Sequence, residues 1–557
     1  MRAKIISSLE KCFPDETVDR KPCLEYLSIL KNERCSFQVC FESDAEAFTR
    51  ERVRFQVVSE LKAHISVYRV RNIPSAFPCY PDNHDENYLR TQPGLYPDLL
   101  EPMGLSERLP VRNMLQALWI EIDPQGKVPA GTYPIVGTFV NDNDETVAQV
   151  KLELEIIGAE LPEQKLIYTQ WFYPDCLMQY YGTKMYSQKH WHILEHFMKN
   201  ARKYGQNMIL TPLLSPELDT YIGGYRPATQ LVDIAVEKGK YRFGFDKLGK
   251  WVDLCDRVGI RYFEINHFFS QWGAAACPQV VATVNGKKKR IFGWDTPSDS
   301  EAYKEFLGAL IPAFLAFMKS KNGADKRCWF HISDEPKLQN MENYEQASRT
   351  LAPLLKGYPV MDALSNYEFY AQKAMDCPVP SVDNIQPFLD HKTENLWTYY
   401  CCAQAKDVSN RFFAMPSARN RIIGTQLYKF GIAGFLHWGY NFYNSQFSYG
   451  RVDPFLCSDA DAYFPSGDAY SVYPGKDGTP WPSMRQVVFY EALQDLRALQ
   501  LCETLYGKEY TIQLLEEGIE PITFTSYPKD AQYLLNLRRR VNAAIKEKGL
   551  KIYGKIQ

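Results

Sequence analysis

The sequence predicts a multidomain α/β protein, with an N-terminal β-sandwich, a (β/α)8 TIM barrel and a short helical C-terminal tail. The length of 557 residues exceeds what one hydrophobic core usually holds. Residues up to about 161 alternate apolar and polar side chains, as strands do. Beyond them, strand-like and helical segments alternate, which is typical of parallel β/α architecture. We therefore expect a sandwich at 1–161, a barrel at 162–505 and a helical extension packed on the barrel at 506–557.

The N-terminal region carries the period of two that half-buried strands show. This alternation occurs in Cys35–Phe41, Val53–Val58 and Val150–Ile157. Two further apolar segments, Leu118–Ile122 and Thr132–Val136, flank a stretch rich in proline and glycine. Short strands separated by such turns favour a β-sandwich.

The second region supplies eight expected strands. They are Leu166–Asp175, Asn207–Leu214, Ile260–His267, Cys328–Asp334, Tyr358–Ala363, Ser381–Gln386, Leu396–Cys402 and Gly434–Asn441. The expected helices His190–Tyr204 and Phe245–Val258 are each followed by glycine, which readily ends a helix. Helix signals are weak around the sixth and seventh strands. Two later helices, Met484–Glu503 and Lys529–Lys548, complete the chain.

An insertion after the third expected strand predicts a β-hairpin. It runs over Val280–Trp294 and turns at Asn285-Gly286, a strong hairpin signal. Its place predicts that it overhangs the C-terminal face of the barrel. The basic run Lys287–Arg290 favours a solvated edge that resists strand pairing over a site for an acidic substituent.

Composition and termini narrow the class of protein. The net charge of −2 implies no nucleic-acid partner. The fourteen cysteines include no C-x-x-C pair, so neither a disulfide framework nor a zinc pattern is indicated. The longest apolar run, Leu307–Met318, is too short to span a bilayer. The first residues lack an apolar signal-peptide core, so we expect a cytoplasmic protein, although a secreted or periplasmic chain trimmed of its signal would look the same. The oligomeric state is not indicated.

Two adjacent acids, Asp334 and Glu335, end the fourth expected strand. Active sites of (β/α)8 barrels lie at the C-terminal ends of the strands. Neighbouring carboxyl groups resist ionising together, which gives one protonated acid and one carboxylate. Cleavage of an acetal such as a sugar linkage needs that combination. The structural alternative is an acidic N-terminus for a helix that follows Pro336.

Polar and aromatic residues at other strand ends are candidate sugar-binding residues. Aromatic side chains make up 14% of the chain, which fits either sugar stacking or large cores. The candidates are Trp171, Tyr173, Asn266, His267, Tyr367, Tyr399, Trp438, Tyr440 and Asn441. Each alone is more often a packing residue, and only their convergence on one face is informative. Glu264 shares a strand face with Asn266 and would be a buried structural acid if that face points into the barrel.

The segment His192-Ile-Leu-Glu-His196 matches the H-x-x-E-H pattern of some zinc peptidases. The helix that carries it should pack on the barrel exterior, and no third ligand is evident. We therefore predict no metal and no cofactor.

Several segments together resemble glycoside hydrolase family 123. Gly434–Asn441, Phe464–Gly475 and Met484–Leu496 resemble the C-terminal part of its catalytic domain, and His331–Pro336 resembles its catalytic strand. The stretch Leu118–Tyr133 resembles the sandwich domain of the family. The resemblance extends to about residue 505.

This resemblance implies a β-sandwich followed by a (β/α)8 barrel. It also implies a retaining exo-β-N-acetylgalactosaminidase, which uses the 2-acetamido group of a glycan or glycolipid substrate to form an oxazoline intermediate. Glu335 would be the general acid/base, and Asp334 would orient the acetamide. Glu335 must then hold a proton near neutral pH, which a charged Asp334 would promote. The remaining expected contacts are Trp438 and Tyr440 in an acetamide pocket and Asn266 and His267 on sugar hydroxyls.

Three alternatives remain open from the residues. A β-N-acetylglucosaminidase or mixed hexosaminidase would share the mechanism, because the two sugars differ only at the 4-hydroxyl. Glu264 would be the nucleophile of a conventional retaining enzyme. A catalytically inactive sugar-binding barrel is the third, and the intact Asp334-Glu335 pair argues against it. Phe442-Tyr-Asn444 differs from the Trp-rich stretch usual in the family, which leaves substrate choice open.

Overall fold

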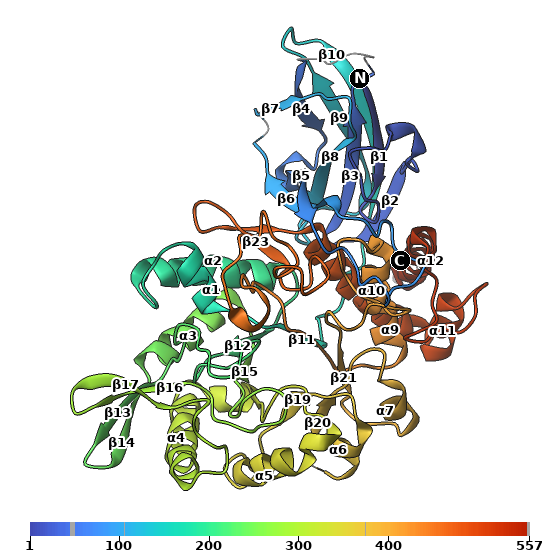
Figure 1. Ribbon diagram of the computed structural model, residues 1–557. Helices are drawn as coiled ribbons and strands as arrows, with labels where there is room; N and C mark the ends of the chain where they lie inside the picture. The colour runs from blue at the N-terminus through green and yellow to red at the C-terminus, as the bar shows by residue number, and fades with distance from the viewer. Residues whose placement is uncertain (45–50, 105, 374, 554–557) are drawn as a thin grey trace.

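The computed structural model describes residues 1–44, 51–104, 106–373 and 375–553. It is a mixed α/β multidomain fold. A β-rich N-terminal domain stands above a larger α/β region, and the C-terminal helices lie near the junction (Figure 1). Within the described residues, no helix combines the length and apolar character that a bilayer span requires.

The N-terminal domain consists of two five-stranded sheets. One has the order β1 (Arg2–Ser7), β3 (Cys35–Glu42), β8 (Gln116–Ile122), β5 (Ile65–Ser75) and β6 (Gly94–Pro102). The other has the order β2 (Tyr26–Leu30), β10 (Thr146–Ile157), β9 (Gly131–Val140), β4 (Arg52–Val58) and β7 (Arg108–Pro110). The alternation expected for β4 is present, since Val53, Phe55 and Val57 are buried whereas Arg52 and Gln56 are exposed. Such one-sided burial forms the apolar core of this domain.

Six parallel strands form the central sheet of the α/β region. Their order is β18 (Cys328–Phe330), β15 (Tyr262–Ile265), β12 (Met208–Thr211), β11 (Ile167–Gln170), β22 (Gly434–His437) and β21 (Trp397–Tyr399). Two more strands, β19 (Met361–Ala363) and β20 (Cys377–Val379), pair in parallel with each other. Single parallel bridges, Phe330 to Val360 and Ser381 to Tyr399, lie between this pair and the two edges of the central sheet. The regular ladders therefore form two sheets, and the carboxyl ends of neighbouring strands point the same way.

The sixth predicted strand is misplaced. The strand occupies Cys377–Val379, whereas Ser381–Gln386 is a turn that leads into α7 (Gln386–Asp390). The backbone N–H of Asn384 bonds to the carbonyl of Ser381 and closes this turn. Prolines within and directly after the strand hide its strand character in the sequence.

Helices surround the parallel strands (Figure 1). They are α1 (Pro174–Tyr180), α2 (Gln188–Lys203), α3 (Asp246–Val258), α4 (Glu301–Ser320), α5 (Met341–Leu351), α6 (Tyr367–Ala371), α8 (Ser417–Arg421) and α9 (Ile423–Lys429). The hydroxyl of Ser187 caps α2 by accepting from the His190 N–H, and α3 ends at Gly259 with φ of 85°. The predicted bounds His190–Tyr204 and Phe245–Val258 lie within two residues of these helices.

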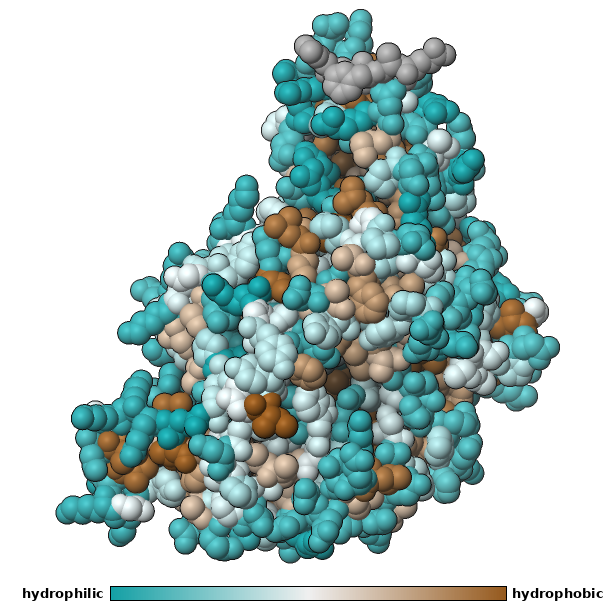
Figure 2. Space-filling model, viewed as in Figure 1, coloured by the Kyte–Doolittle hydropathy of each residue, from teal (hydrophilic) through white to brown (hydrophobic). Residues whose placement is uncertain are grey.

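The predicted hairpin is confirmed as β16 (Val280–Val284) and β17 (Lys287–Phe292). It joins β13 (Asp233–Glu237) and β14 (Lys240–Gly244) in a four-stranded sheet that projects at the lower left of Figure 1. The side chains of Lys287–Arg290 are exposed. Hydrophobic residues on the visible face of the molecule form small, separate patches, and one of these patches lies over this sheet (Figure 2).

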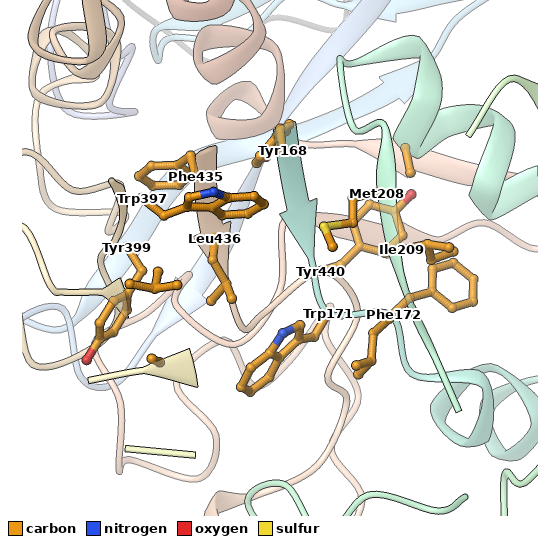
Figure 3. Close-up of a cluster of buried hydrophobic side chains, with 14 of the residues drawn as sticks. Tyr168, Trp171, Phe172, Met208, Ile209, Trp397, Tyr399, Phe435, Leu436 and Tyr440 are labelled. Carbon is orange, nitrogen blue, oxygen red and sulfur yellow. The ribbon is translucent and has the colours of Figure 1, made fainter. Parts of the chain in front are cut away.

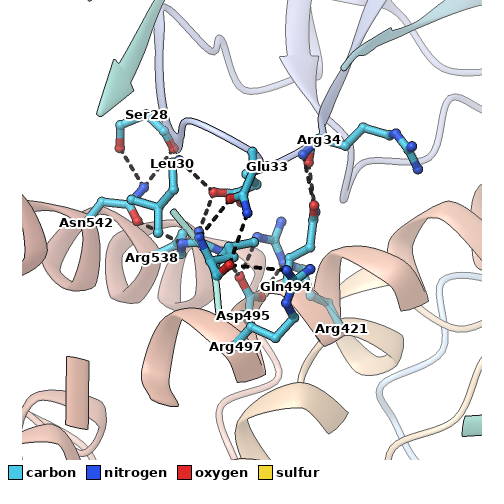
Figure 4. A network of polar contacts seen from close by, with 12 residues as sticks. Ser28, Leu30, Glu33, Arg34, Arg421, Gln494, Asp495, Arg497, Arg538 and Asn542 are labelled. Carbon is cyan, nitrogen blue, oxygen red and sulfur yellow. Dashed lines mark hydrogen bonds and ion pairs between the residues drawn. The ribbon is translucent and has the colours of Figure 1, made fainter. Parts of the chain in front are cut away.

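The C-terminal helices connect the two parts of the molecule. They are α10 (Met484–Tyr506), α11 (Lys508–Leu515) and α12 (Ala531–Tyr553), and a small β23 (Val472–Pro474) and β24 (Pro480–Pro482) ribbon precedes them. Arg538 of α12 forms ion pairs with Glu33 of the sandwich and with Asp495 of α10, at 2.8 Å for the latter (Figure 4). Arg421 of α8 binds the same Asp495 at 2.7 Å. These side chains are less than one tenth exposed, so the network holds the sandwich to the α/β region.

Candidate active site

A cavity of about 230 Å³ lies where the parallel strands end. Its walls are Trp171, Tyr173, Leu218, Asp219, Gln271, Trp272, Asp334, Glu335, Ala363, Tyr399, Cys401, Cys402, Leu436, Trp438, Gln446 and Phe464. Most of these residues belong to the ends of β11, β15, β18, β19, β21 and β22 or to the loops that follow them. The two predicted acids thus lie in a common cavity with aromatic side chains.

The acid pair sits on a loop that its neighbours hold tightly. Glu335 has a φ of 41°, a left-handed conformation that costs a non-glycine residue about 1–3 kcal/mol. The Trp272 N–H donates to the Asp334 carbonyl at 2.8 Å, and the Glu335 N–H donates to the Ala363 carbonyl at 3.1 Å. These two backbone hydrogen bonds therefore hold the strained segment in place.

Tyr399 is a direct partner of Glu335. Its phenol donates to Glu335 Oε1 at 2.6 Å. Desolvation raises the pKa of Glu335, and this hydrogen bond opposes the rise because it favours the charged form. Desolvation also raises the pKa of Asp334 well above its ordinary range, with the charge of Glu335 as the next cause. Burial therefore raises the pKa of both carboxyl groups, and the charge of Glu335 further disfavours ionisation of Asp334.

His331 lies between two buried carboxylates, three residues before Asp334. Its Nε2 is 2.8 Å from Glu264 Oε1, and its Nδ1 is 2.9 Å from Asp362 Oδ1. Burial alone would lower the pKa of His331, but hydrogen bonds and charge from Asp362 and Glu264 raise it to about 9. Asp362 also accepts from the Tyr344 hydroxyl at 2.7 Å. A charged histidine thus holds the start of the loop that carries Asp334 and Glu335.

Glu264 anchors one wall of the cavity without lining it. It is fully buried, and its Oε1 accepts from Trp171 Nε1 at 2.7 Å. Its Oε2 accepts from the hydroxyl of Thr169. These contacts favour a structural role for Glu264 over that of a conventional nucleophile. Both of its carboxylate oxygens are engaged in hydrogen bonds, and Glu264 does not line the cavity.

Trp438 forms another wall, and a second buried acid holds it. Its Nε1 donates to Asp468 Oδ2 at 2.8 Å, and its carbonyl accepts from the Tyr173 hydroxyl at 3.0 Å. Burial raises the pKa of Asp468 to about 7. Trp171, Tyr173, Tyr399 and Trp438 are the sequence-predicted sugar contacts that the cavity contains.

Two predicted contacts near the end of β22 lie outside the cavity walls. The Tyr440 hydroxyl donates to the Phe197 carbonyl at 2.8 Å, and its ring stacks on that of Phe172 among the buried hydrophobic side chains (Figure 3). The Asn441 side chain bonds to both backbone groups of Tyr173 at 2.9 and 3.0 Å. The chain leaves the strand after His437, so the alternation of the strand no longer predicts where these side chains point. Both have structural contacts in place of the expected sugar contacts.

Three further predicted contacts also lie apart from the cavity walls. Asn266 donates to the His267 carbonyl at 2.7 Å and accepts from the Leu214 N–H at 2.8 Å. His267 is buried beneath Trp171, and its ring centroid lies 5.2 Å from that ring. Tyr367 stacks on His391 at 4.3 Å, at the start of α6. Asn266 and His267 are buried directly after β15, and Tyr367 packs against His391, so none of the three lines the cavity.

Residues from long loops contribute walls that the sequence did not reveal. Asp219 follows β12, Gln271 and Trp272 follow β15, and Gln446 and Phe464 follow β22. Burial raises the pKa of Asp219 to about 6. Loop residues follow no hydrophobic period, so the sequence pattern does not show which of them line the cavity. Trp272, next to Gly273, is a large aromatic among them that a search for sugar contacts could have selected.

One group of side chains has metal-ligand types. Among the described residues, His267, His331 and Asp362 place ligand atoms within 4.8 Å of one another. Both ring nitrogens of His331 already bond to carboxylates, and its ring stacks on His267 at 4.2 Å. Hydrogen bonding therefore accounts for His331 and Asp362, whereas neither ring nitrogen of the buried His267 has a hydrogen-bond partner among the described residues. In the H-x-x-E-H segment, Glu195 forms an ion pair with Lys199 at 2.8 Å on the outer helix α2.

The glycoside hydrolase 123 catalytic domain model matches residues 171–502, more than half of the chain. The chain belongs to glycoside hydrolase family 123. Over 100% of both chains, it superposes with a TM-score of 0.75 and 14% identity on a family 123 glycoside hydrolase from Clostridium perfringens, described in a study of glycolipid glycan hydrolysis. No curated protein matches. Family membership identifies a glycosidase with a carbohydrate substrate.

Two other solved structures are more distant. A family 2 glycosyl hydrolase from Bacteroides cellulosilyticus DSM 14838 is 10% identical, with 76% of this chain and 45% of that chain covered and a TM-score of 0.27. A Parabacteroides merdae β-glucuronidase is 12% identical, with 74% and 46% covered and a TM-score of 0.26. Similarity this low carries no argument about fold or activity.

Proposed function

We propose that this family 123 member is a retaining exo-β-N-acetylgalactosaminidase that works by substrate-assisted catalysis. The observation that carries the proposal is the adjacency of Asp334 and Glu335 in one cavity wall. A conventional retaining glycosidase places two carboxyl groups about 5–5.5 Å apart across the scissile bond. Adjacent side chains of one loop suit a different mechanism. In it, one acid contacts the glycosidic oxygen and the other contacts the 2-acetamido group.

Contact with the substrate amide would determine which carboxyl group of the pair is charged. The acetamide N–H donates to Asp334, which favours the charged form of that carboxyl group. The proton then resides on Glu335, which gives it to the glycosidic oxygen as the bond to C1 breaks. The acetamide carbonyl oxygen attacks C1 at the same time and forms an oxazolinium ion, the protonated oxazoline, whose positive charge Asp334 stabilises.

The second step reverses the role of Glu335. Its carboxylate takes a proton from water as the water oxygen attacks C1, which opens the oxazoline and restores the acetamide. Two inversions at C1 give a product with retained configuration. Tyr399 holds Glu335 in place throughout, and Trp171 and Trp438 provide flat apolar walls for the sugar ring.

We further propose that the eight parallel strands constitute a (β/α)8 barrel. The bridges at Phe330–Val360 and Ser381–Tyr399 support this arrangement, because they connect the β19–β20 pair to both edges of the six-stranded sheet. The position of the cavity at the carboxyl ends of these strands also supports it.

The choice of sugar rests on the family resemblance. We propose a terminal β-linked N-acetylgalactosamine on a glycan or glycolipid, in keeping with the glycolipid glycans named for the Clostridium perfringens relative. A β-N-acetylglucosaminidase of the same mechanism is the alternative, because only the orientation of the 4-hydroxyl separates the two sugars.

The test is hydrolysis of aryl β-N-acetylgalactosaminides and β-N-acetylglucosaminides by the wild type and by Glu335→Gln. We expect the wild type to cleave the galacto substrate. The variant should lose most activity on a nitrophenyl glycoside and less on a dinitrophenyl glycoside, because the better leaving group needs no acid. Folded wild type that cleaves neither sugar would overturn the proposal.

A further inference from the structure

Four aromatic side chains form a row that begins in the cavity wall and runs outward. Trp272 lines the cavity, and its ring centroid lies 5.5 Å from that of Phe447. Phe447 lies 6.1 Å from Tyr449, and Tyr449 stacks on Tyr221 at 4.8 Å with an angle of 16° between the ring planes. We call Trp272, Phe447, Tyr449 and Tyr221 the aromatic ledge.

The aromatic ledge is not part of the hydrophobic core. Trp272 is 38% exposed, Tyr221 41% and Tyr449 67%. Single exposed apolar residues are normal on protein surfaces, but a continuous row of rings is typical of a binding site. This row is continuous with the cavity that holds Asp334 and Glu335, so any ligand it binds can extend from that cavity.

Hydrogen bonds fix the two loops that carry Tyr221, Phe447 and Tyr449. The Tyr221 N–H donates to the Phe447 carbonyl at 3.0 Å. Asp219 Oδ2 accepts from the Phe447 N–H at 3.2 Å, and the Ser448 hydroxyl donates to the Asp219 carbonyl at 2.7 Å. These loops therefore present their rings in a fixed arrangement before a ligand binds, which lowers the entropy lost on binding.

The loop that carries Trp272 is tied to the same framework. Gln271 Oε1 accepts from the Asp219 N–H at 2.6 Å, and its Nε2 donates to the Thr220 carbonyl at 2.9 Å. Trp272 and Phe447 have φ values of 59° and 56°, a left-handed conformation that costs each about 1–3 kcal/mol. Strain of this kind persists only where the surrounding contacts over-determine it, and it is frequent at ligand-binding sites.

We propose that the aromatic ledge binds the sugars that follow the terminal residue of a neutral oligosaccharide substrate. This inference rests on the proposed function, which places the terminal N-acetylhexosamine in the cavity. Flat rings stack on the apolar faces of pyranoses, and the two tyrosine hydroxyls offer hydrogen bonds to sugar hydroxyls. The Asp219 carboxyl group that accepts from the Phe447 N–H would repel an anionic sugar, so the aromatic ledge favours a neutral glycan.

A lipid tail is the competing occupant. Ile222, beside Tyr221, is 77% exposed and would suit an alkyl chain. It is one aliphatic side chain next to four aromatic rings, and stacked planar rings match a sugar face better than a flexible chain. The experiment separates the two occupants.

The test compares Tyr221→Ala and Tyr449→Ala with the control Tyr510→Ala. Tyr510 is 38% exposed and stacks on Tyr506 at 4.6 Å, so the control removes a similar ring from α11. Three substrates with terminal β-N-acetylgalactosamine are used: an aryl glycoside, an octyl glycoside and a neutral trisaccharide. We expect the ratio of kcat/KM for the trisaccharide to that for the aryl glycoside to fall about tenfold in each ledge variant, which corresponds to about 1.4 kcal/mol, and to hold in the control.

Two results would overturn the inference. The first is a ratio that stays at the wild-type value in both ledge variants. The second is an equal loss on the octyl glycoside, which would assign the aromatic ledge to a lipid chain.

Failure of the proposed function gives a different pattern. Folded wild type would then leave the aryl N-acetylgalactosaminide intact, and the aromatic ledge is tested by calorimetry with a panel of neutral oligosaccharides. The proteins are Glu335→Gln and Glu335→Gln combined with Tyr449→Ala. Binding about tenfold weaker in the double variant supports the inference, and equal binding or none at all overturns it.

Discussion

The phenol of Tyr399 donates a 2.6 Å hydrogen bond to Oε1 of Glu335, which joins the end of β21 to the loop after β18. Desolvation and this bond act on the Glu335 pKa in opposite directions. A general acid must hold its proton before the reaction and release it during bond cleavage. Desolvation and the hydrogen bond together set the pKa of Glu335, so a substitution at Tyr399 should shift this pKa in a predictable direction.

Tyr399→Phe should raise the pKa of Glu335, because the hydrogen bond that favours the charged form is lost. The high-pH limb of the activity profile should move to higher pH. Activity should fall about ten- to a hundredfold, since a hydrogen bond to a charged group contributes about 1.5–3 kcal/mol. The measurement is kcat/KM against pH on an aryl glycoside. Tyr358→Phe is the matched control, because its phenol bonds to Asp325 at 3.1 Å away from the cavity. An unchanged profile in Tyr399→Phe would contradict the role given to this phenol.

His331→Asn should destabilise the protein in a pH-dependent way. The pKa of His331 is about 9 in the folded protein and about 6.5 when unfolded. A raised folded pKa means that the contribution is complete below about pH 6.5 and is lost as the pH rises through about 9. We expect the variant to lose about 3 kcal/mol of unfolding free energy at pH 6 and progressively less towards pH 9.5.

Urea unfolding of His331→Asn and the wild type at several pH values measures this difference. His64→Asn is the control, because His64 is only partly buried and its Nδ1 contacts a backbone carbonyl, not a carboxylate. A deficit of the same size at pH 6 and pH 9.5 would show that the charge of His331 is not the cause.

The ion pairs between the sandwich and α12 should contribute far more than surface pairs. Arg538→Met leaves Glu33 buried without its arginine partner, so we expect a loss of about 3–5 kcal/mol in unfolding free energy. Arg540→Met is the matched control two residues away, where a pair with Glu517 at 2.7 Å is largely exposed and should contribute about 0–1 kcal/mol. Denaturant unfolding of both variants measures the contrast. Equal losses would mean that the buried network does not hold the domains together.

Local signals in the sequence were sufficient for much of the fold. The period of two located β4 and β10, and Gly205 and Gly259 marked the ends of two helices. Adjacent carboxyl groups at the end of an apolar strand indicated where the cavity lies, because parallel strands bring their carboxyl ends together. Each of these inferences needs only neighbouring residues.

Features that depend on tertiary contacts could not be read in this way. The left-handed φ of Glu335 is held by backbone bonds from other loops, and the aromatic ledge joins Tyr221, Trp272 and Tyr449 from three loops far apart in the chain. Tyr440 alternates with Trp438 in sequence, but the strand ends before either residue, so they point to different places. Such relationships follow from loop paths, for which the sequence offers no period.

Participation of the substrate amide is the central claim, and fluorinated substrates test it most directly. Aryl β-glycosides with N-acetyl, N-fluoroacetyl, N-difluoroacetyl and N-trifluoroacetyl groups differ in the nucleophilicity of the amide oxygen, and the leaving group stays the same. The mechanism predicts that kcat/KM falls steeply with each added fluorine. A kcat/KM that is independent of fluorine content would contradict the mechanism and would favour a nucleophile supplied by the protein.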